Sequence, residues 1–71
     1  MEIMNHKLIA SGANEEVQIF LDRWNYNTYT VSIHYSDDRE TTHEDFDSIA
    51  WSCHRFFNAC NEFGVTPVKN F

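Results

Sequence analysis

Residues 46–63 repeat apolar side chains at every third or fourth position, and this pattern constrains the fold more than any other feature. The repeating positions are Phe46, Ile49, Ala50, Cys53, Phe56, Phe57, Cys60 and Phe63. A helix places residues with this spacing on one face. The pattern therefore predicts an amphipathic helix whose apolar face packs on a core.

Both ends of this predicted helix carry recognisable signals. Thr41 with Glu44, or Thr42 with Asp45, has the spacing of a capping box, in which both side chains bond backbone N–H groups of the first turn. Acidic residues would then occupy the helix N-terminus, where the macrodipole favours negative charge. Gly64 predicts the C-terminal end, because glycine readily adopts the left-handed conformation that closes a helix.

The segment 28–35, TYTVSIHY, alternates between two kinds of side chain. Tyr29, Val31, Ile33 and Tyr35 are aromatic or apolar, whereas the residues between them are Thr, Ser and His. Successive side chains of a strand point to opposite faces of a sheet. The alternation therefore predicts a strand with one buried face and one polar face.

The segment 16–24, EVQIFLDRW, fits two interpretations. As a strand, it folds back on residues 28–35 over a short loop centred on Tyr26, which sets apolar residues opposite each other on one face. The predicted pairs are Val17 with Tyr35, Ile19 with Ile33 and Leu21 with Val31. The alternative is a helix that starts after Asn14. Its apolar stripe would consist of Val17, Phe20, Leu21 and Trp24. The matching register favours the hairpin.

Two further segments extend the predicted sheet. HKLIAS, residues 6–11, is a candidate first strand, joined to the next strand by a turn that contains Gly12. VTPVKNF, residues 65–71, is a candidate edge strand, because Pro67 lacks the N–H group that a central strand needs. We therefore predict one α+β domain spanning residues 1–71. It would be a small antiparallel β-meander of about three strands with one amphipathic C-terminal α-helix packed on one face.

The charge of the chain favours one class of partner over others. Its 71 residues include 11 acids and 5 scattered bases, which give a net charge of −6. Direct binding of nucleic acid relies on clustered Lys and Arg, so a basic partner fits this chain better. No apolar run is long enough for a membrane span, and the first residues lack the order of a signal peptide. We expect a soluble, cytoplasmic protein that binds neither nucleic acid nor membranes directly.

The residues that most often carry chemistry are sparse. Cys53 and Cys60 would lie roughly 10 Å apart along the predicted helix, so an internal disulfide is not expected. Both thiols fall on the predicted buried stripe, which argues against a nucleophilic role. His6, His34, His43 and His54 show no metal-binding spacing. The sequence therefore predicts no enzyme, no cofactor and no metal site.

Six carboxylates crowd into residues 37–47. They are Asp37, Asp38, Glu40, Glu44, Asp45 and Asp47. One interpretation is a solvated loop that runs into the start of a helix. The other is a working surface that imitates a row of phosphates and binds a nucleic-acid-binding surface of another protein. The two interpretations are compatible. A calcium loop does not fit, because the required order of acids and glycine is absent.

Three aromatic residues are candidate anchors for a partner. In the hairpin register Trp24 stands with Phe20 on the polar face of the sheet, and Tyr26 lies at the tip of the loop. Trp51 lies off the apolar stripe of the helix and beside the acidic residues. Exposed aromatic residues commonly anchor protein interfaces. Alternatively, Phe20 and Trp24 belong to a core, either a minor one on this face or the main one in the helical interpretation.

A small acidic chain with the hairpin EVQIFLDRWNYNTYTVSIHY followed by the helix EDFDSIAWSCHRFFNACNEFG resembles the small phage-encoded anti-defence proteins, anti-CRISPR proteins among them. The resemblance concerns size, charge and the order of elements over about two thirds of the chain. These proteins share no motif, so it assigns no functional residue. It implies a stoichiometric inhibitor in the host cytoplasm that occludes a nucleic-acid or partner site of a defence complex.

Three hypotheses of function remain. The first is an inhibitor or adaptor that binds a larger protein or ribonucleoprotein with a basic surface, through the six carboxylates and the anchors Trp24, Tyr26 and Trp51. The second is a structural or regulatory module that forms a homodimer through the aromatic face of its sheet. The third, a minimal metal or thiol enzyme, has the least support.

Overall fold

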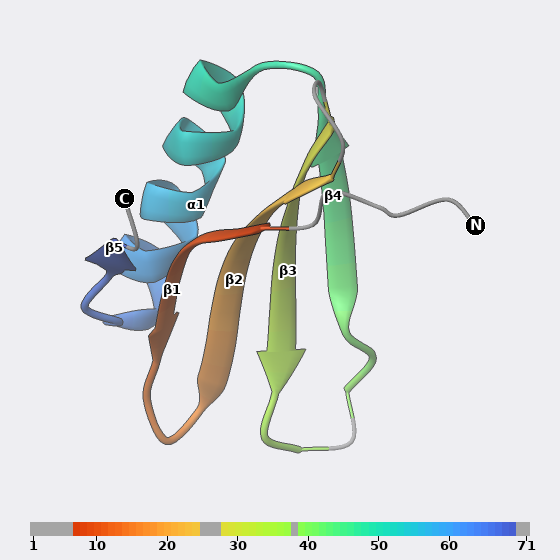
Figure 1. The fold of residues 1–71 in the computed structure, drawn as a ribbon. Coiled ribbons are helices and arrows are strands. Elements are labelled where there is room, and N and C mark those ends of the chain that lie inside the picture. The colour runs from red at the N-terminus through yellow and green to blue at the C-terminus, as the bar shows by residue number, and fades with distance from the viewer. Residues whose placement is uncertain (1–6, 25–27, 38, 70–71) are drawn as a thin grey trace.

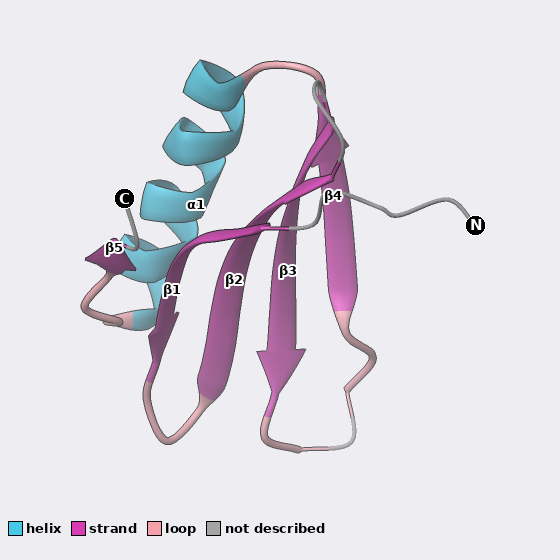
Figure 2. Cartoon of the chain, in the orientation of Figure 1, coloured by secondary structure: helices cyan, strands magenta, loops and turns pink. Residues whose placement is uncertain are grey.

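The computed structural model describes residues 7–24, 28–37 and 39–69. The elements are β1 (Lys7–Ala13), β2 (Val17–Trp24), β3 (Thr28–Tyr35), β4 (Thr42–Phe46), α1 (Ile49–Phe63) and β5 (Val68–Lys69). The strands form one antiparallel sheet in the order β4-β3-β2-β1-β5, and α1 lies across one face of it (Figure 1). The predicted α+β class is confirmed, with five strands in place of about three (Figure 2).

The central hairpin has the predicted register. Val17 pairs with Tyr35, Ile19 with Ile33 and Leu21 with Val31. The helical alternative for residues 16–24 is wrong, because period-two alternation matched across two strands puts all of these side chains on one face, where only Tyr35 is half-buried and the others are buried. On the opposite face, the other residues of β2, which include Phe20 and Trp24, consequently pair with the Thr, Ser and His residues of β3.

The turn between β1 and β2 differs from the prediction. Gly12 lies within β1, and Asn14 forms the turn: its Oδ1 accepts hydrogen bonds from the backbone N–H groups of Glu16 (2.8 Å) and Val17 (2.9 Å). The Asn14 side chain also donates to the backbone oxygen of Phe63 at 2.8 Å, which ties the turn to the end of α1.

Gly12 is needed for packing. A Cβ atom at this position would lie 2.5 Å from Cγ1 of Val65, which is itself buried in the core. The segment after α1 therefore crosses β1 in contact with its backbone before it forms β5. The predicted edge strand is confirmed as Val68–Lys69, which pairs with Ala10 and Ser11 of β1.

The predicted start of the helix is wrong. Neither candidate capping box forms, because residues 42–46 are strand β4 and pair with β3. The helix begins at Ile49, where Ser48 is the N-cap and accepts a hydrogen bond from the Trp51 N–H group. The first turn contains no acidic residue. Cross-strand pairing has overridden the local capping signal.

The predicted end of the helix is confirmed. Gly64 adopts the left-handed conformation, with φ of 68°. The N–H group of Gly64 donates to the oxygen of Asn61, and that of Val65 donates to the oxygen of Cys60 at 2.8 Å. These two bonds form a Schellman motif, and Val65 and Cys60 belong to the same core cluster.

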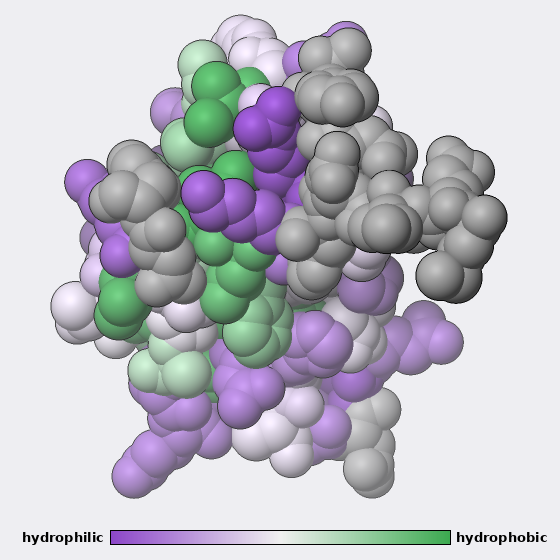
Figure 3. Space-filling view, viewed as in Figure 1, coloured by the Kyte–Doolittle hydropathy of each residue, from purple (hydrophilic) through white to green (hydrophobic). Residues whose placement is uncertain are grey.

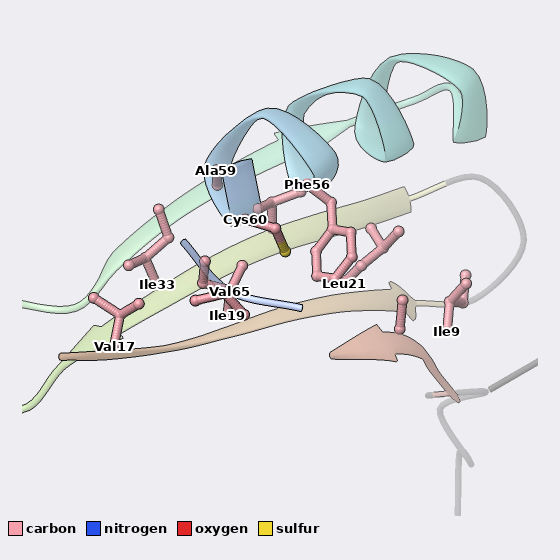
Figure 4. Packing of buried hydrophobic residues seen from close by; sticks show 11 residues of the cluster. Ile9, Val17, Ile19, Leu21, Ile33, Phe56, Ala59, Cys60 and Val65 are labelled. Atoms are coloured by element: carbon pink, nitrogen blue, oxygen red, sulfur yellow. The ribbon is translucent and has the colours of Figure 1, made fainter. Parts of the chain in front are cut away.

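The core lies between α1 and the helix-facing side of the sheet. Its buried members are Ile9, Ala10, Val17, Ile19, Leu21, Val31, Ile33, Phe56, Ala59, Cys60 and Val65. Phe56 and Cys60 point from α1 toward β2, the strand that carries Leu21 and Ile19 (Figure 4). In the space-filling view, hydrophobic residues gather between α1 and the strands, whereas hydrophilic residues dominate the end with the β1–β2 and β3–β4 loops (Figure 3).

The buried face of α1 is rotated relative to the predicted stripe. Ser52 and Ala59 are buried, whereas Ile49 is 49% exposed and Phe57 is 36% exposed. The Ser52 hydroxyl is tolerated there because it donates to the backbone oxygen of Ile49 at 2.9 Å. Among the residues described, no helix has the length and apolarity needed to cross a membrane.

Replacing Phe56 with Ala should lower the free energy of unfolding by about 3–5 kcal/mol, because the fully buried ring would leave a cavity. Phe57→Ala is the matched control and should cost clearly less, since its ring is already partly in water. Urea denaturation followed by tryptophan fluorescence measures both losses. Equal losses would contradict the described orientation of α1.

Gly12→Ala should destabilise the protein by about 1–3 kcal/mol, because the added methyl group meets Val65. The same substitution in a Val65→Ala background should cost less, since the obstructing methyl group is gone. Chemical denaturation of the four proteins gives the coupling. An identical cost in both backgrounds would show that the two residues do not meet.

Candidate partner-binding surface

The carboxylates of β4 point to opposite faces of the sheet. Glu44 lies on the helix side, where its Oε1 accepts a hydrogen bond from Nε of Arg55 at 3.1 Å. Asp45 lies on the other side, where its Oδ1 accepts a hydrogen bond from the Thr30 hydroxyl at 2.8 Å. The predicted acidic row is therefore divided by the alternation of an edge strand.

Asp37 and Glu40 lie in the loop between β3 and β4, at the end of the sheet away from the start of α1 (Figure 1). Nε of Arg39 bonds Asp37 at 2.9 Å, and the Arg39 guanidinium lies 4.2 Å from the centre of the Tyr35 ring. This bond holds the pKa of the Asp37 carboxyl below its usual value. Asp38 lies outside the described residues. The loop acids are thus separate from the acids at the far end of β4.

A shallow depression unites three of the predicted site residues. It lies where β4 ends and α1 begins, has a volume of about 500 Å³, and is lined by Thr28, Asp45, Phe46, Asp47 and Trp51. Trp24 is the cross-strand partner of Thr28, so this candidate anchor stands beside the depression. Tyr26 lies outside the described residues. We call these five lining residues the acidic–aromatic patch.

The indole of Trp51 is presented to solvent by the local structure. Ser48 caps the helix by bonding the Trp51 N–H group, and the indole packs edge-on against His54 with ring centres 6.0 Å apart. Its side chain is nevertheless 66% exposed, the most exposed large hydrophobic residue described. Burial of such a ring against a partner would remove a large apolar area from water.

The acidic–aromatic patch suits a cationic side chain. Two carboxylates attract a Lys or Arg head group, and the face of an indole attracts the same cation through its quadrupole. The described structure places Asp45, Asp47 and Trp51 around one hollow, which gives such a side chain a place to enter.

The sheet face away from α1 carries a polar row that sequence reasoning did not identify as a network. The Ser32 hydroxyl lies 3.0 Å from Nδ1 of His43, and the Thr41 hydroxyl lies 3.1 Å from Nδ1 of His34. Phe20 contacts His34 edge-on with ring centres 5.4 Å apart and is half-buried. The alternation of β3 carried part of this signal, but His43 joins the row only because β4 is a strand.

The histidines and cysteines form no group with obvious chemistry in the part of the chain described. There, no three His, Cys, Asp or Glu side chains come together in a way that could hold a metal ion. Both cysteines are free thiols. Cys60 is buried as predicted, and desolvation raises its pKa. Cys53 is only half-buried, because the buried face of α1 is rotated away from it.

Replacing Arg39 with Gln should raise the pKa of Asp37 toward its ordinary value, because the bond to the guanidinium is lost. Since the folded-state pKa is depressed, this contact stabilises the fold above the ordinary carboxyl pKa and is lost as the pH falls through the lowered value. NMR titration of the side-chain carboxyl measures the change. Arg55→Gln removes the same charge elsewhere and should leave the Asp37 pKa unchanged; an equal shift in both variants would contradict the local contact.

Comparison with known proteins leaves the residues themselves as the basis for any assignment. No protein-family model matches this chain, and neither a curated protein nor a solved structure matches it. The acidic–aromatic patch is therefore the feature from which a function can be argued.

Proposed function

We propose that this protein is a small acidic, non-catalytic binding protein that inhibits a larger protein or ribonucleoprotein by covering a basic surface. The observation that carries the proposal is the gathering of Asp45, Asp47 and Trp51 around one depression at the end of β4. Carboxylates beside an exposed indole form a site for Lys or Arg, the residues with which proteins bind phosphates.

The overall charge also supports binding to a basic surface. A net charge of −6 on 71 residues attracts a basic surface at long range and raises the rate of encounter. The carboxylates of Asp37 and Glu40, at the other end of β4, extend the negative potential beyond the patch. Contacts at both ends of β4 would compete with nucleic acid for the same Lys and Arg side chains of the partner.

The resemblance to phage-encoded anti-defence proteins supplies a specific form of this proposal. The partner would be the nucleic-acid-binding or partner-binding surface of a host defence complex in the cytoplasm, as it is for anti-CRISPR proteins that act by occlusion. One inhibitor would occupy one site, and no cofactor would be needed. Size, acidity and element order support this form.

An alternative is a self-associating module without catalytic activity. The exposed apolar side chains favour it: Ile49, Phe57 and Val68 accompany Trp51 at the surface, each at least 36% exposed. Burial of these side chains in a homodimer would release apolar area from water. Such an interface would persist at high salt, whereas contacts between exposed charges weaken.

The double variant Asp47→Lys with Trp51→Ala should lose the partner, because it reverses one charge of the patch and removes its anchor. Tagged parent protein and variant are incubated with bacterial lysate at low salt and at roughly 0.5 M salt, where charges are screened within a few ångströms. Mass spectrometry identifies the proteins retained. We expect a nucleic-acid-binding protein that is retained by the parent at low salt, released at high salt and displaced by added nucleic acid.

Glu15→Lys is the matched control, because it makes the same change in charge in the β1–β2 turn, far from the patch. It should retain the partner at the parent level. Equal retention by the double variant would overturn the assignment of the patch. A dimer in light scattering, together with the absence of any partner at either salt, would favour the self-associating alternative.

A further inference from the structure

In the part of the chain that the structure describes, β4 is an edge strand with one unpaired side. Within the described residues it pairs with β3 alone, and it ends the strand order β4-β3-β2-β1-β5. Four of its five residues are exposed, and only Phe46 is half-buried. An edge strand directs alternate N–H and C=O groups away from its single neighbour, so these groups can bond another strand.

We propose that β4 binds an extended, basic segment of the partner as an additional strand of the sheet. This inference rests on the proposed function, because it names the part of the basic partner that the acidic surface recognises. Main-chain hydrogen bonds along residues 42–46 would provide the pairing, and side chains on both faces would provide the selection.

The charges of β4 select the sign of the added strand. Glu44 lies on the helix side of the sheet and Asp45 on the opposite side, as their bonds to Arg55 and Thr30 show. A paired strand also alternates its side chains, so Lys or Arg on either face would meet a carboxylate. Arg55 already forms an ion pair with Glu44 and partly neutralises it. Asp45 and the acidic–aromatic patch therefore attract a cationic side chain more strongly than Glu44 does.

The same charges disfavour pairing between two copies of this chain. Antiparallel pairing of β4 with a second β4, centred on Glu44 or on Asp45, would set that carboxylate directly opposite its copy on one face, and like charges across strands are destabilising. Charged residues on edge strands commonly prevent such self-pairing. The same carboxylates would attract a basic strand. The charges of β4 therefore favour a basic strand over a second copy of this chain.

The acidic–aromatic patch lies at the end of this same edge. Asp45 and Phe46 belong to β4, and Asp47 follows it directly, so a strand added along β4 would continue into the depression. A cationic side chain from that continuation could then reach Asp47 and the indole of Trp51. Strand addition and the patch are thus parts of one binding path.

NMR titration of the full chain with a capped peptide of alternating lysine and threonine residues tests the proposal. We expect shifts of the backbone amide signals of residues 42–46 and slower hydrogen exchange of their outward amides. The same peptide, N-methylated at alternate residues, keeps its charge but cannot make the ladder of hydrogen bonds. It should bind at least about tenfold more weakly, the effect of losing one or two such bonds. A peptide of alternating glutamate and threonine should not bind.

The outcomes separate this inference from the proposed function. Equal binding of the methylated and unmethylated lysine peptides would overturn strand addition and leave an acidic surface that binds basic partners. Binding with shifts confined to elements other than β4 would also overturn strand addition. No binding of either lysine peptide at low salt would overturn both the added strand and the basic partner.

Discussion

The pairing of β2 with β3 in one register underlies the rest of the structure. Because side chains alternate along a strand, this register puts Ile19, Leu21, Val31 and Ile33 on one face. Residues such as Phe20, Asp22, Thr30 and Ser32 lie on the other. A slip of one residue would exchange the two faces. The apolar face then provides the surface on which Phe56 and Cys60 of α1 are buried.

The two outer edges of this hairpin are completed in different ways. On one side β1 pairs with β2, and Gly12 lets Val65 pack against the backbone of β1. The C-terminal segment consequently folds over that edge and ends as β5. On the other side β4 pairs with β3 and is left as an exposed edge. Among the described residues, the sheet is therefore covered at one edge and exposed at the other, and the exposed edge carries Glu44 and Asp45.

Strand pairing changes what the acidic residues can do. On a helix start, Glu44 and Asp45 would neighbour each other near a helix terminus; on β4 they face opposite sides of the sheet and bond Arg55 and Thr30. Asp47, in the short connection to α1, instead joins Trp51 at a hollow. The proposed function rests on this division. One end of the β4 edge presents an indole beside carboxylates, and the rest of the edge presents backbone groups between charged side chains.

The sequence by itself determined two kinds of element. One kind has a local signal, and the other consists of paired strands whose apolar residues alternate with the same period. The alternation of residues 28–35 and its register with residues 17–24 were sufficient for the hairpin, and Gly64 was sufficient for the end of α1. Ser48, directly before the helix, was a usable N-cap signal, but the capping-box spacing of residues 41–45 competed with it. Such local signals are weak, each worth about a kcal/mol, so tertiary contacts override them easily.

Only the tertiary structure decided the placement of residues 42–46, of Gly12 and of the candidate site. Residues 42–46 have little apolar pattern of their own and become a strand because β3 offers an unpaired edge and polar partners such as Thr30 and Ser32. The local sequence predicts a turn at Gly12. Its role in close packing depends instead on Val65, which is distant in sequence. Asp45, Asp47 and Trp51 meet because β4 ends where α1 begins, and that junction is set by long-range pairing and burial.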